Sequence, residues 1–209
     1  MPTILELRTA PVGSYSTNAY VLVCPVTRQS VLVDPGDEPD KLQELLKDTN
    51  PVAILLTHTH FDHVGALAEM RTRLQVPLML HRGPHAEGFN AQVDRWLEDG
   101  DRVDVGEYGL RVFFTPGHTD DQICYGIEGD SRILVGDTIF DGGPGKTWSL
   151  EGFQRTLKTL RDVILQWPDD AICYPGHGSS FRLGNQRSGI EVFLQKDHGD
   201  FFGDASWDM

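Results

Sequence analysis

Four residues that commonly bind metal ions fall within six positions of the chain. His58, His60, Asp62 and His63 directly follow the apolar segment Val52 to Leu56, which has the composition of a buried strand. In an extended chain, residues two apart point the same way, so His58 and His60 can both face one ion. Asp62 and His63 follow as the chain turns, so they can face a second point. A lone histidine in such a place is usually a core or surface residue, whereas four donors at this density indicate a metal site.

Three further residues of these types each come just after a segment that has the pattern of a strand. His118 and His177 each follow a Pro-Gly pair, which is typical of a tight turn, and Asp137 follows a glycine. Strand ends can gather on one edge of a sheet sandwich, so residues far apart in the chain can converge there. We therefore expect one centre built from seven residues, namely His58, His60, Asp62, His63, His118, Asp137 and His177.

The elements that must position these residues show two periodicities. Alternating, β-branched runs predict strands at Ile4 to Thr9, Asn18 to Val23, Ser30 to Val33, Val52 to Leu56, Pro77 to Leu80, Leu110 to Phe114, Ile123 to Ile127, Ile133 to Val135 and Ala171 to Tyr174. Apolar residues at every third or fourth position predict helices at Asp40 to Lys47, Leu67 to Leu74, Leu150 to Ile164 and Ile190 to Leu194. Strands and helices in two comparable halves predict an α/β protein with two packed sheets and helices outside.

The chain has no repeat, linker or low-complexity segment, and its 209 residues suit one core. We therefore expect residues 1–209 to form a single domain. The segment from Arg82 to Asp99 is expected to be irregular. Ser149 can cap the start of the longest helix, and Pro168 is expected to close it.

The charge and the cysteines restrict the class of protein. A formal net charge of -13 at pH 7 argues against nucleic acid and against an anionic membrane surface as partners. The first residues lack the basic start and apolar run of a secretory signal, and no stretch approaches the roughly 20 apolar residues of a membrane span. Cys24, Cys124 and Cys173 are an odd number in apolar runs, which favours buried thiols over disulfides. We expect a cytoplasmic protein that acts on a small molecule.

The run His58-Thr59-His60-Phe61-Asp62-His63, followed in order by His118, Asp137 and His177, resembles the metallo-β-lactamase superfamily. The resemblance extends from about Asn18 to His177, and the turn Asp34-Pro35-Gly36 also fits it. It implies a four-layer αβ/βα sandwich of two mixed sheets with helices outside and metals at one rim.

The resemblance also implies a role for each donor. His58, His60 and His118 would hold a first metal ion, and Asp62, His63 and His177 would hold a second, with Asp137 bridging both. Asp34 would orient a ligand or the loop. Two divalent ions are implied, with zinc favoured and iron or manganese also compatible with these donors. A hydroxide shared by the ions, with its pKa lowered toward ~7, would attack the substrate, and Asp62 would handle the proton or orient the nucleophile.

Within the superfamily, the segment from Gly136 to Lys146 resembles the glyoxalase II group, the hydroxyacylglutathione hydrolases, which cleave thioesters of glutathione. Two features differ. Pro144 stands where that group commonly has cysteine, and only about thirty residues follow His177, where that group carries a helical domain that binds glutathione. We therefore expect a thioester or ester hydrolase, with Lys146 and Trp148 lining the substrate pocket.

Some features have no clear place in this scheme. The acidic and aromatic segment from Asp200 to Asp208 can cover the mouth of the site, make a contact in a homo-oligomer, or stay solvated. His81, His85 and His198 lie apart from the motifs, and we expect no direct metal role for them.

Other functions stay open on the sequence alone. The chain also resembles the persulfide dioxygenases, in which a single iron would use His58, His118 and Asp137. A lactone, β-lactam or phosphodiester hydrolase is a further alternative. The absence of an export signal disfavours the β-lactamase, and the acidity disfavours the nuclease. A binding module without catalysis is least favoured, because intact ligand sets usually accompany chemistry.

Overall fold

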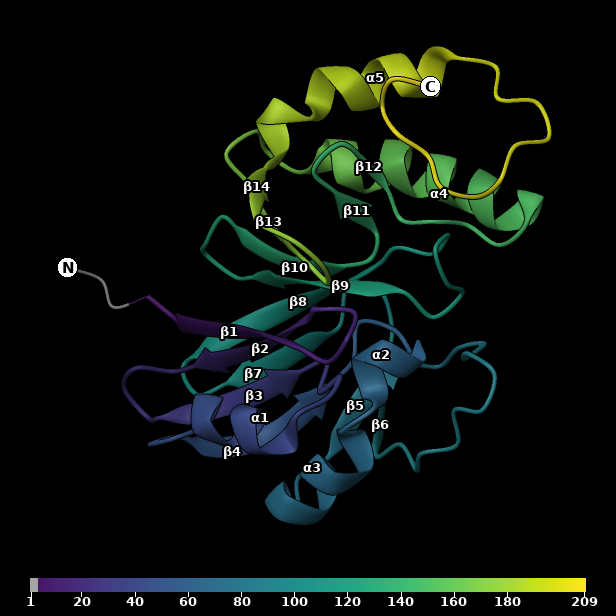
Figure 1. Ribbon diagram of the computed structural model, residues 1–209. Helices are drawn as coiled ribbons and strands as arrows, with labels where there is room; N and C mark the ends of the chain where they lie inside the picture. Colours follow the sequence, from purple (N-terminus) through teal and green to yellow (C-terminus); the bar gives the residue numbers. More distant parts are fainter. Residues whose placement is uncertain (1–3) are drawn as a thin grey trace.

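The computed structural model describes residues 4–209, which form four layers (Figure 1). The first sheet contains, in spatial order, β1 (Glu6–Val12), β2 (Thr17–Val23), β3 (Gln29–Val33), β4 (Asn50–Leu55), β5 (Leu78–His81) and β6 (Arg95–Leu97). The second contains, in spatial order, β14 (Phe181–Arg182), β13 (Ile172–Pro175), β10 (Arg132–Gly136), β9 (Ile123–Ile127), β8 (Tyr108–Phe114) and β7 (Arg102–Val105). A small hairpin pairs β11 (Ile139–Phe140) with β12 (Gly143–Pro144).

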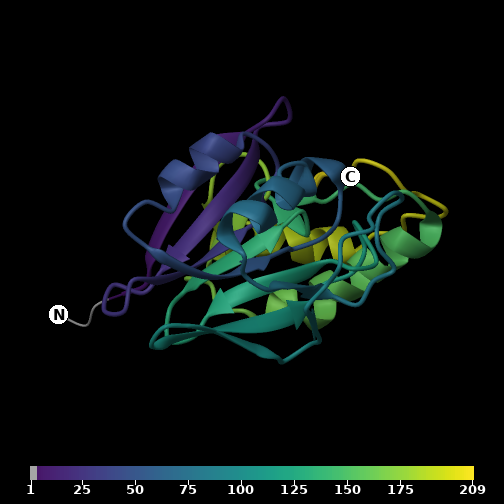
Figure 2. The same ribbon diagram turned by 90° about the horizontal axis from the view of Figure 1, so that it is seen from below.

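Helices form the two outer layers. Helices α1 (Pro39–Leu45) and α3 (Leu67–Leu74) cover the first sheet, as the blue helices in Figure 2 show. Helices α4 (Leu150–Asp162) and α5 (Arg187–Gln195) cover the second sheet. The short helix α2 (Phe61–Val64) and the 3-10 turns η1 (Ile164–Gln166) and η2 (Leu183–Asn185) lie in the connections. This arrangement confirms the expected four-layer α/β sandwich of two mixed sheets.

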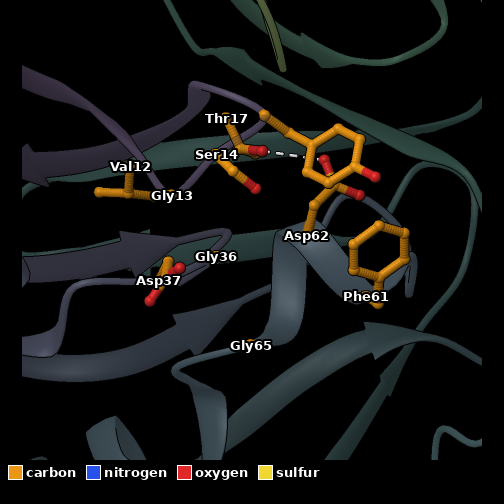
Figure 3. A pocket seen from close by; sticks show the side chains of 10 residues that line it. Val12, Gly13, Ser14, Thr17, Gly36, Asp37, Phe61, Asp62 and Gly65 are labelled. Carbon is orange, nitrogen blue, oxygen red and sulfur yellow. Dashed lines mark hydrogen bonds between the residues drawn. The ribbon is translucent and has the colours of Figure 1, made fainter.

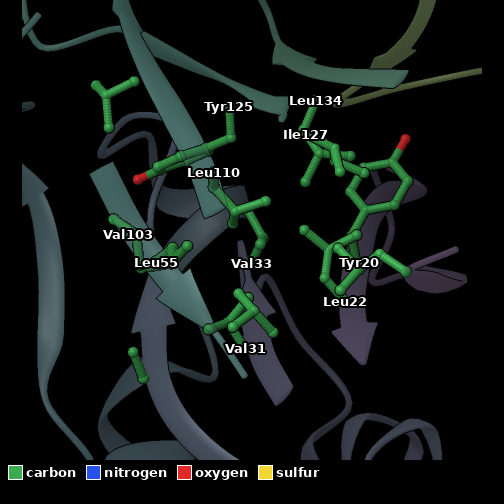
Figure 4. Close-up of a cluster of buried hydrophobic side chains, with 14 of the residues drawn as sticks. Tyr20, Leu22, Val31, Val33, Leu55, Val103, Leu110, Tyr125, Ile127 and Leu134 are labelled. Carbon is green, nitrogen blue, oxygen red and sulfur yellow. The ribbon is translucent and has the colours of Figure 1, made fainter. Parts of the chain in front are cut away.

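Alternation along the strands builds three apolar layers. On β2, Tyr20 and Leu22 face the second sheet, whereas Val21 and Val23 face α1 and α3. Figure 4 shows the layer between the sheets, in which side chains of the first sheet such as Leu22 and Val31 share one apolar cluster with side chains of the second sheet such as Tyr125. Successive strand residues point to opposite faces, so a strand buried on both sides must be apolar throughout. Burying each Leu, Val or Phe contributes about 1.5–3 kcal/mol, which fixes the positions of the strand ends.

Several details of the expected secondary structure were wrong, and the two-residue strands β11, β12 and β14 were not expected. The segment from Arg82 to Asp99, expected to be irregular, contains the three-residue strand β6, and the strand β7 was not foreseen. Strand β6 is too short to show an alternation, whereas Arg102 to Val105 does alternate between polar and apolar residues, so β7 could have been predicted from the sequence. The helix that begins at Leu150 ends at Asp162 and continues as a 3-10 turn, so Pro168 lies beyond its end. Ser149 does cap its start, because its Oγ accepts a 3.0 Å hydrogen bond from the Gly152 amide.

The three cysteines are buried and unpaired, as expected. Within residues 4–209, no helix combines the length and apolarity needed to cross a membrane.

The C-terminal segment, residues 197–209, packs onto the second half of the molecule. Trp207 is only 7% exposed and lies in the apolar cluster under α4 and α5, with its ring 5.5 Å from that of Phe193. Its indole Nε1 donates to Gln186 Oε1 at 2.9 Å. Figure 1 shows this segment in yellow, returning beside the hairpin of β11 and β12. The segment is therefore part of the folded core and not a solvated end.

We predict that Trp207→Ala lowers the free energy of unfolding by about 3 kcal/mol, because it leaves a cavity under α5. In a chain of this size, the loss lowers the midpoint of thermal unfolding by roughly 8 °C. Phe202→Ala is the matched control in the same segment, since Phe202 is 53% exposed, and it should shift the midpoint little. Equal midpoints for the two variants in thermal denaturation would show that the segment does not contribute to the core.

Candidate metal centre

Strand direction brings the expected donors to one edge of the molecule. Strand β10 runs antiparallel to β9, which runs antiparallel to β8, so β8 and β10 point the same way. Strand β13 runs parallel to β10, so the loops after β8, β10 and β13 all emerge at the same edge. Strands β3 and β4 are likewise parallel, so the loops that follow them share one edge of the first sheet. The amide of Ile123 donates to the Thr57 carbonyl at 2.8 Å, which joins the two edges.

The first group of donors consists of three histidines. His60 Nδ1 lies 3.2 Å from His58 Nε2 and 2.9 Å from His118 Nε2. His58 and His118 are buried, and His60 is partly exposed. The spacing places three ligand nitrogens around one point.

The second group consists of Asp62, His63 and His177. His177 Nε2 lies 3.2 Å from Asp62 Oδ2, and His63 Nε2 lies 3.7 Å from the same oxygen. Figure 3 shows Asp62 at the start of its helix, reached by Thr17, whose hydroxyl donates to Asp62 Oδ2 at 2.8 Å.

Asp137 lies between the two groups. Its Oδ2 is 3.5 Å from His118 Nε2 and 3.4 Å from His177 Nε2, and its Oδ1 is 3.5 Å from His63 Nε2. Gly176 makes this approach possible, since a Cβ there would lie 2.0 Å from Asp137 Oδ1. The structure thus brings all seven sequence-predicted donors together.

Outer hydrogen bonds of three imidazoles leave the second nitrogen of each of these rings free to bind a cation. His63 Nδ1 donates to Asp34 Oδ2 at 2.9 Å, His118 Nδ1 to the Lys146 carbonyl at 2.7 Å, and His177 Nδ1 to the Tyr15 carbonyl at 3.1 Å. The buried atoms His63 Nε2 and Asp137 Oδ1 have no hydrogen-bond partner. Buried polar atoms are rarely left unpaired, so this donor set fits divalent cations.

Asp34 holds the two donor-bearing segments in register. Besides His63, it accepts hydrogen bonds from the Thr57 amide at 2.8 Å and the Thr57 hydroxyl at 2.7 Å. The Thr57 hydroxyl oxygen in turn lies 3.1 Å from His58 Nδ1 and can accept a hydrogen bond from it. Asp34 is only 1% exposed. This geometry supports the orienting role implied for it by the family resemblance.

Other positioning residues gave no signal in the sequence. The Asn18 amide group donates to the Pro175 and Gly178 carbonyls at 3.0 and 2.8 Å, so it fixes the loop that carries His177. Thr59 Oγ1 donates to Asp121 Oδ2 at 2.6 Å, and this hydrogen bond restrains the segment that carries His58 and His60. The sequence shows only that Asn18 and Thr59 are polar residues at or near the ends of apolar strands, which does not distinguish them from other such residues.

Electrostatics divides the donors into two sets. Burial disfavours the charged forms of His58, His60 and His118 and lowers their pKa values, that of His60 to about 4. Burial also opposes charge on His63, but the Asp137 and Asp34 carboxylates outweigh it and raise its pKa to about 10.

In the remaining donors, as in His63, charged neighbours outweigh the effect of burial on the pKa. Against burial, hydrogen bonds with Asp137 and Asp62 raise the pKa of His177 to about 9. Burial opposes ionisation of Asp62 and Asp137, but the neighbouring His177 and His63 hold both pKa values low, that of Asp62 at about 2. Without metal, the second group therefore carries protons that the first group lacks.

Two hollows are each lined partly by the seven donors, whose shared edge of the molecule is called the donor edge from here on. One is lined by the turn after β1, including Tyr15, and by Phe61 and Asp62 (Figure 3). The other is lined by His60, His118 and Trp148. Of the two residues expected to line the substrate pocket, Trp148 lines this hollow and Lys146 does not, although Lys146 Nζ lies 5.0 Å from the centre of the Trp148 ring. Among residues 4–209, the donor clusters do not include His81, His85 or His198.

Comparison with known proteins agrees with the fold and the donor edge. A family model for the metallo-beta-lactamase superfamily matches residues 12–177, and the chain belongs to that superfamily, whose members are generally metal-dependent hydrolases. It is 32% identical over 221 residues to the probable metallo-hydrolase YqgX of Bacillus subtilis, across 97% of this chain and 100% of that protein. It is 30% identical over 190 residues to hydroxyacylglutathione hydrolase of Hahella chejuensis, across 90% of this chain and 71% of that protein.

Solved structures show the same fold. ETHE1 from Myxococcus xanthus has a TM-score of 0.79 at 27% identity, across 93% of this chain and 86% of that one. TTHA1623, solved in a di-iron-bound form, has a TM-score of 0.73 at 31% identity, across 86% of this chain and 96% of that one.

Replacing Asp34 should weaken metal binding without removing a metal-facing atom. In Asp34→Asn, the amide cannot accept from His63 and Thr57 as the carboxylate does, so we predict a 10–100-fold loss of metal affinity. Asp37→Asn, at an exposed neighbour, is the control. Competition with a chromophoric chelator measures both, and equal affinities would exclude an orienting role for Asp34.

The two groups of donors should differ in their response to pH. A cation must displace protons from His63 and His177 in the second group, whose pKa values are about 10 and 9, but displaces none from the first group near neutral pH. We predict that the weaker of two binding steps strengthens from pH 6.5 to 8.5, by up to about tenfold per unit for each proton displaced. The tighter step should change little. Calorimetric titration with Zn²⁺ tests this, and two equally pH-dependent steps would contradict it.

Proposed function

We propose that this protein is a dinuclear metal-dependent hydrolase of thioesters or esters. The observation that carries the proposal is the position of Asp137, whose carboxylate lies within 3.5 Å of histidine nitrogens from both donor groups. His58, His60 and His118 would hold one cation, Asp62, His63 and His177 the other, and Asp137 both. Two such cations, when bound, lower the pKa of water and polarise a carbonyl. Their identity is proposed as zinc, with iron or manganese as alternatives.

Asp62 orients the attacking water in this proposal. A carboxyl with a pKa of about 2 is a weak base near neutral pH, so it accepts a hydrogen bond but does not hold the proton. The Thr17 hydroxyl, which donates to Asp62 Oδ2 at 2.8 Å, fixes the direction of that carboxylate.

The two hollows suit a substrate with two arms. The reacting carbonyl of a thioester or ester joins an acyl arm to a thiol or alcohol arm. The donor Asp62 lines the hollow at Tyr15, and the donors His60 and His118 line the hollow at Trp148. Trp148 is 62% exposed and offers an apolar face beside His60, with ring centres 6.1 Å apart. The similarity to a hydroxyacylglutathione hydrolase supports a thioester as substrate.

A mononuclear iron oxidoreductase of the persulfide dioxygenase type is the second candidate. It rests on His58, His118 and Asp137 lying close together, with His118 Nε2 at 3.5 Å from Asp137 Oδ2. In that case the second group of donors would hold no metal.

Elemental analysis of protein purified without added metal, together with turnover of simple thioesters, separates the candidates. We predict two metal ions per chain and thioester hydrolysis. One iron per chain, with oxygen consumption on a persulfide, would favour the second candidate and overturn the first.

Removal of the shared carboxylate should abolish both metal binding and turnover. We predict that Asp137→Ala binds less than one metal ion per chain and loses at least about a hundredfold in kcat/KM, because both donor groups lose a ligand. Asp170→Ala, an exposed aspartate outside the donor edge, is the control. Full turnover by Asp137→Ala would contradict the bridging role.

A further inference from the structure

The C-terminal segment, residues 197–209, is fastened to the loop that carries Lys146 and Trp148. The Thr147 amide donates to the Gly203 carbonyl at 3.0 Å, and the Gly203 amide donates back to Thr147 Oγ1 at 3.1 Å. The Trp207 amide donates to the Gly142 carbonyl at 2.9 Å. These three hydrogen bonds attach the segment to the loop at Gly142 and Thr147.

Close packing makes the attachment specific. A Cβ on Gly143 would lie 2.3 Å from the Ala205 carbonyl oxygen, so only glycine admits the segment there. Gln186 Oε1 accepts from both the Gly142 amide, at 3.1 Å, and the Trp207 indole, at 2.9 Å. With Trp207 buried, the segment holds a fixed position over the loop.

In this position, Asp204 of the segment pairs with Lys146, the lysine that lies beside Trp148. Asp204 Oδ2 lies 3.0 Å from Lys146 Nζ. The same ammonium lies over the Trp148 ring, which lines the hollow next to His60 and His118. Residues 197–209 contain four aspartates and no lysine or arginine. Asp204 therefore pairs with the positive charge of Lys146 at this mouth, and it belongs to a segment that is acidic overall.

We propose that Asp204 is a specificity-determining residue that makes the site select thioesters with an uncharged thiol arm over those with an anionic one. The inference rests on the proposed hydrolase function. An anionic arm passing Trp148 must compete with Asp204 for Lys146, whereas a neutral arm meets only the ring face. Because the pair is partly exposed, its effect on selectivity is a few-fold and weakens with salt.

The test compares two acetyl thioesters, one of N-acetylcysteamine, which is neutral, and one of mercaptosuccinate, which carries two carboxylates. In Asp204→Asn, we expect kcat/KM for the anionic thioester to rise about threefold relative to the neutral one, through KM with kcat unchanged. Asp204→Glu should keep the wild-type ratio. Asp200→Asn, with the same change of charge on an exposed residue of the same segment, should also leave the ratio near that of wild type.

Two further measurements separate this role from a structural one. The double variant Asp204→Asn with Lys146→Met should lose the gain, because the released ammonium is gone. Equilibrium binding of free mercaptosuccinate and N-acetylcysteamine to the zinc-loaded proteins should show the same change in ratio without turnover. If no thioester is hydrolysed, the proposed function fails and this binding ratio alone decides the role of Asp204. Equal ratios in wild type and Asp204→Asn, a gain as large in Asp200→Asn, or no binding of either thiol would overturn the proposal.

Discussion

The metal centre depends on where three histidine side chains hold their ring protons. These protons point away from the centre. His63, His118 and His177 each donate their Nδ1 proton to a carboxylate or carbonyl, which leaves Nε2 turned toward the centre. Burying ring nitrogens and carboxylate oxygens that face one another without protons costs free energy. A bound cation or added protons between these atoms remove that cost. The raised pKa of His63 in the metal-free protein has this same origin. Much of the nearby structure serves to hold these outer hydrogen bonds.

The acceptors of these hydrogen bonds come from distant parts of the chain. Asp34 follows β3, the Tyr15 carbonyl belongs to the turn between β1 and β2, and the Lys146 carbonyl lies after β12. Each is brought to the edge by strand pairing within a sheet or by packing between sheets. The apolar layers thus determine the donor geometry indirectly, because they set where every strand stops. A metal site of this kind requires a rigid sandwich, and the double-sided burial of β2 and β4 provides one.

The donors were predictable from the sequence because each carries a local signal. A dense cluster after an apolar strand and two Pro-Gly-His turns can be read without knowing the fold. The positioning residues were not predictable in this way. Asn18 acts on carbonyls about 160 positions away, and Asp204 meets Lys146 only because Trp207 is buried under α5. Such contacts depend on tertiary packing and leave no periodic pattern. The short strand β6 was missed for a related reason, since three residues cannot display an alternation.

We propose that this edge binds two cations that share the Asp137 carboxylate. Anomalous X-ray scattering from crystals of the zinc-loaded protein, recorded on both sides of the zinc edge, tests it most directly. We predict two anomalous peaks that flank Asp137, one beside His58, His60 and His118 and the other beside Asp62, His63 and His177. A single peak at saturating zinc, or peaks away from these side chains, would contradict it.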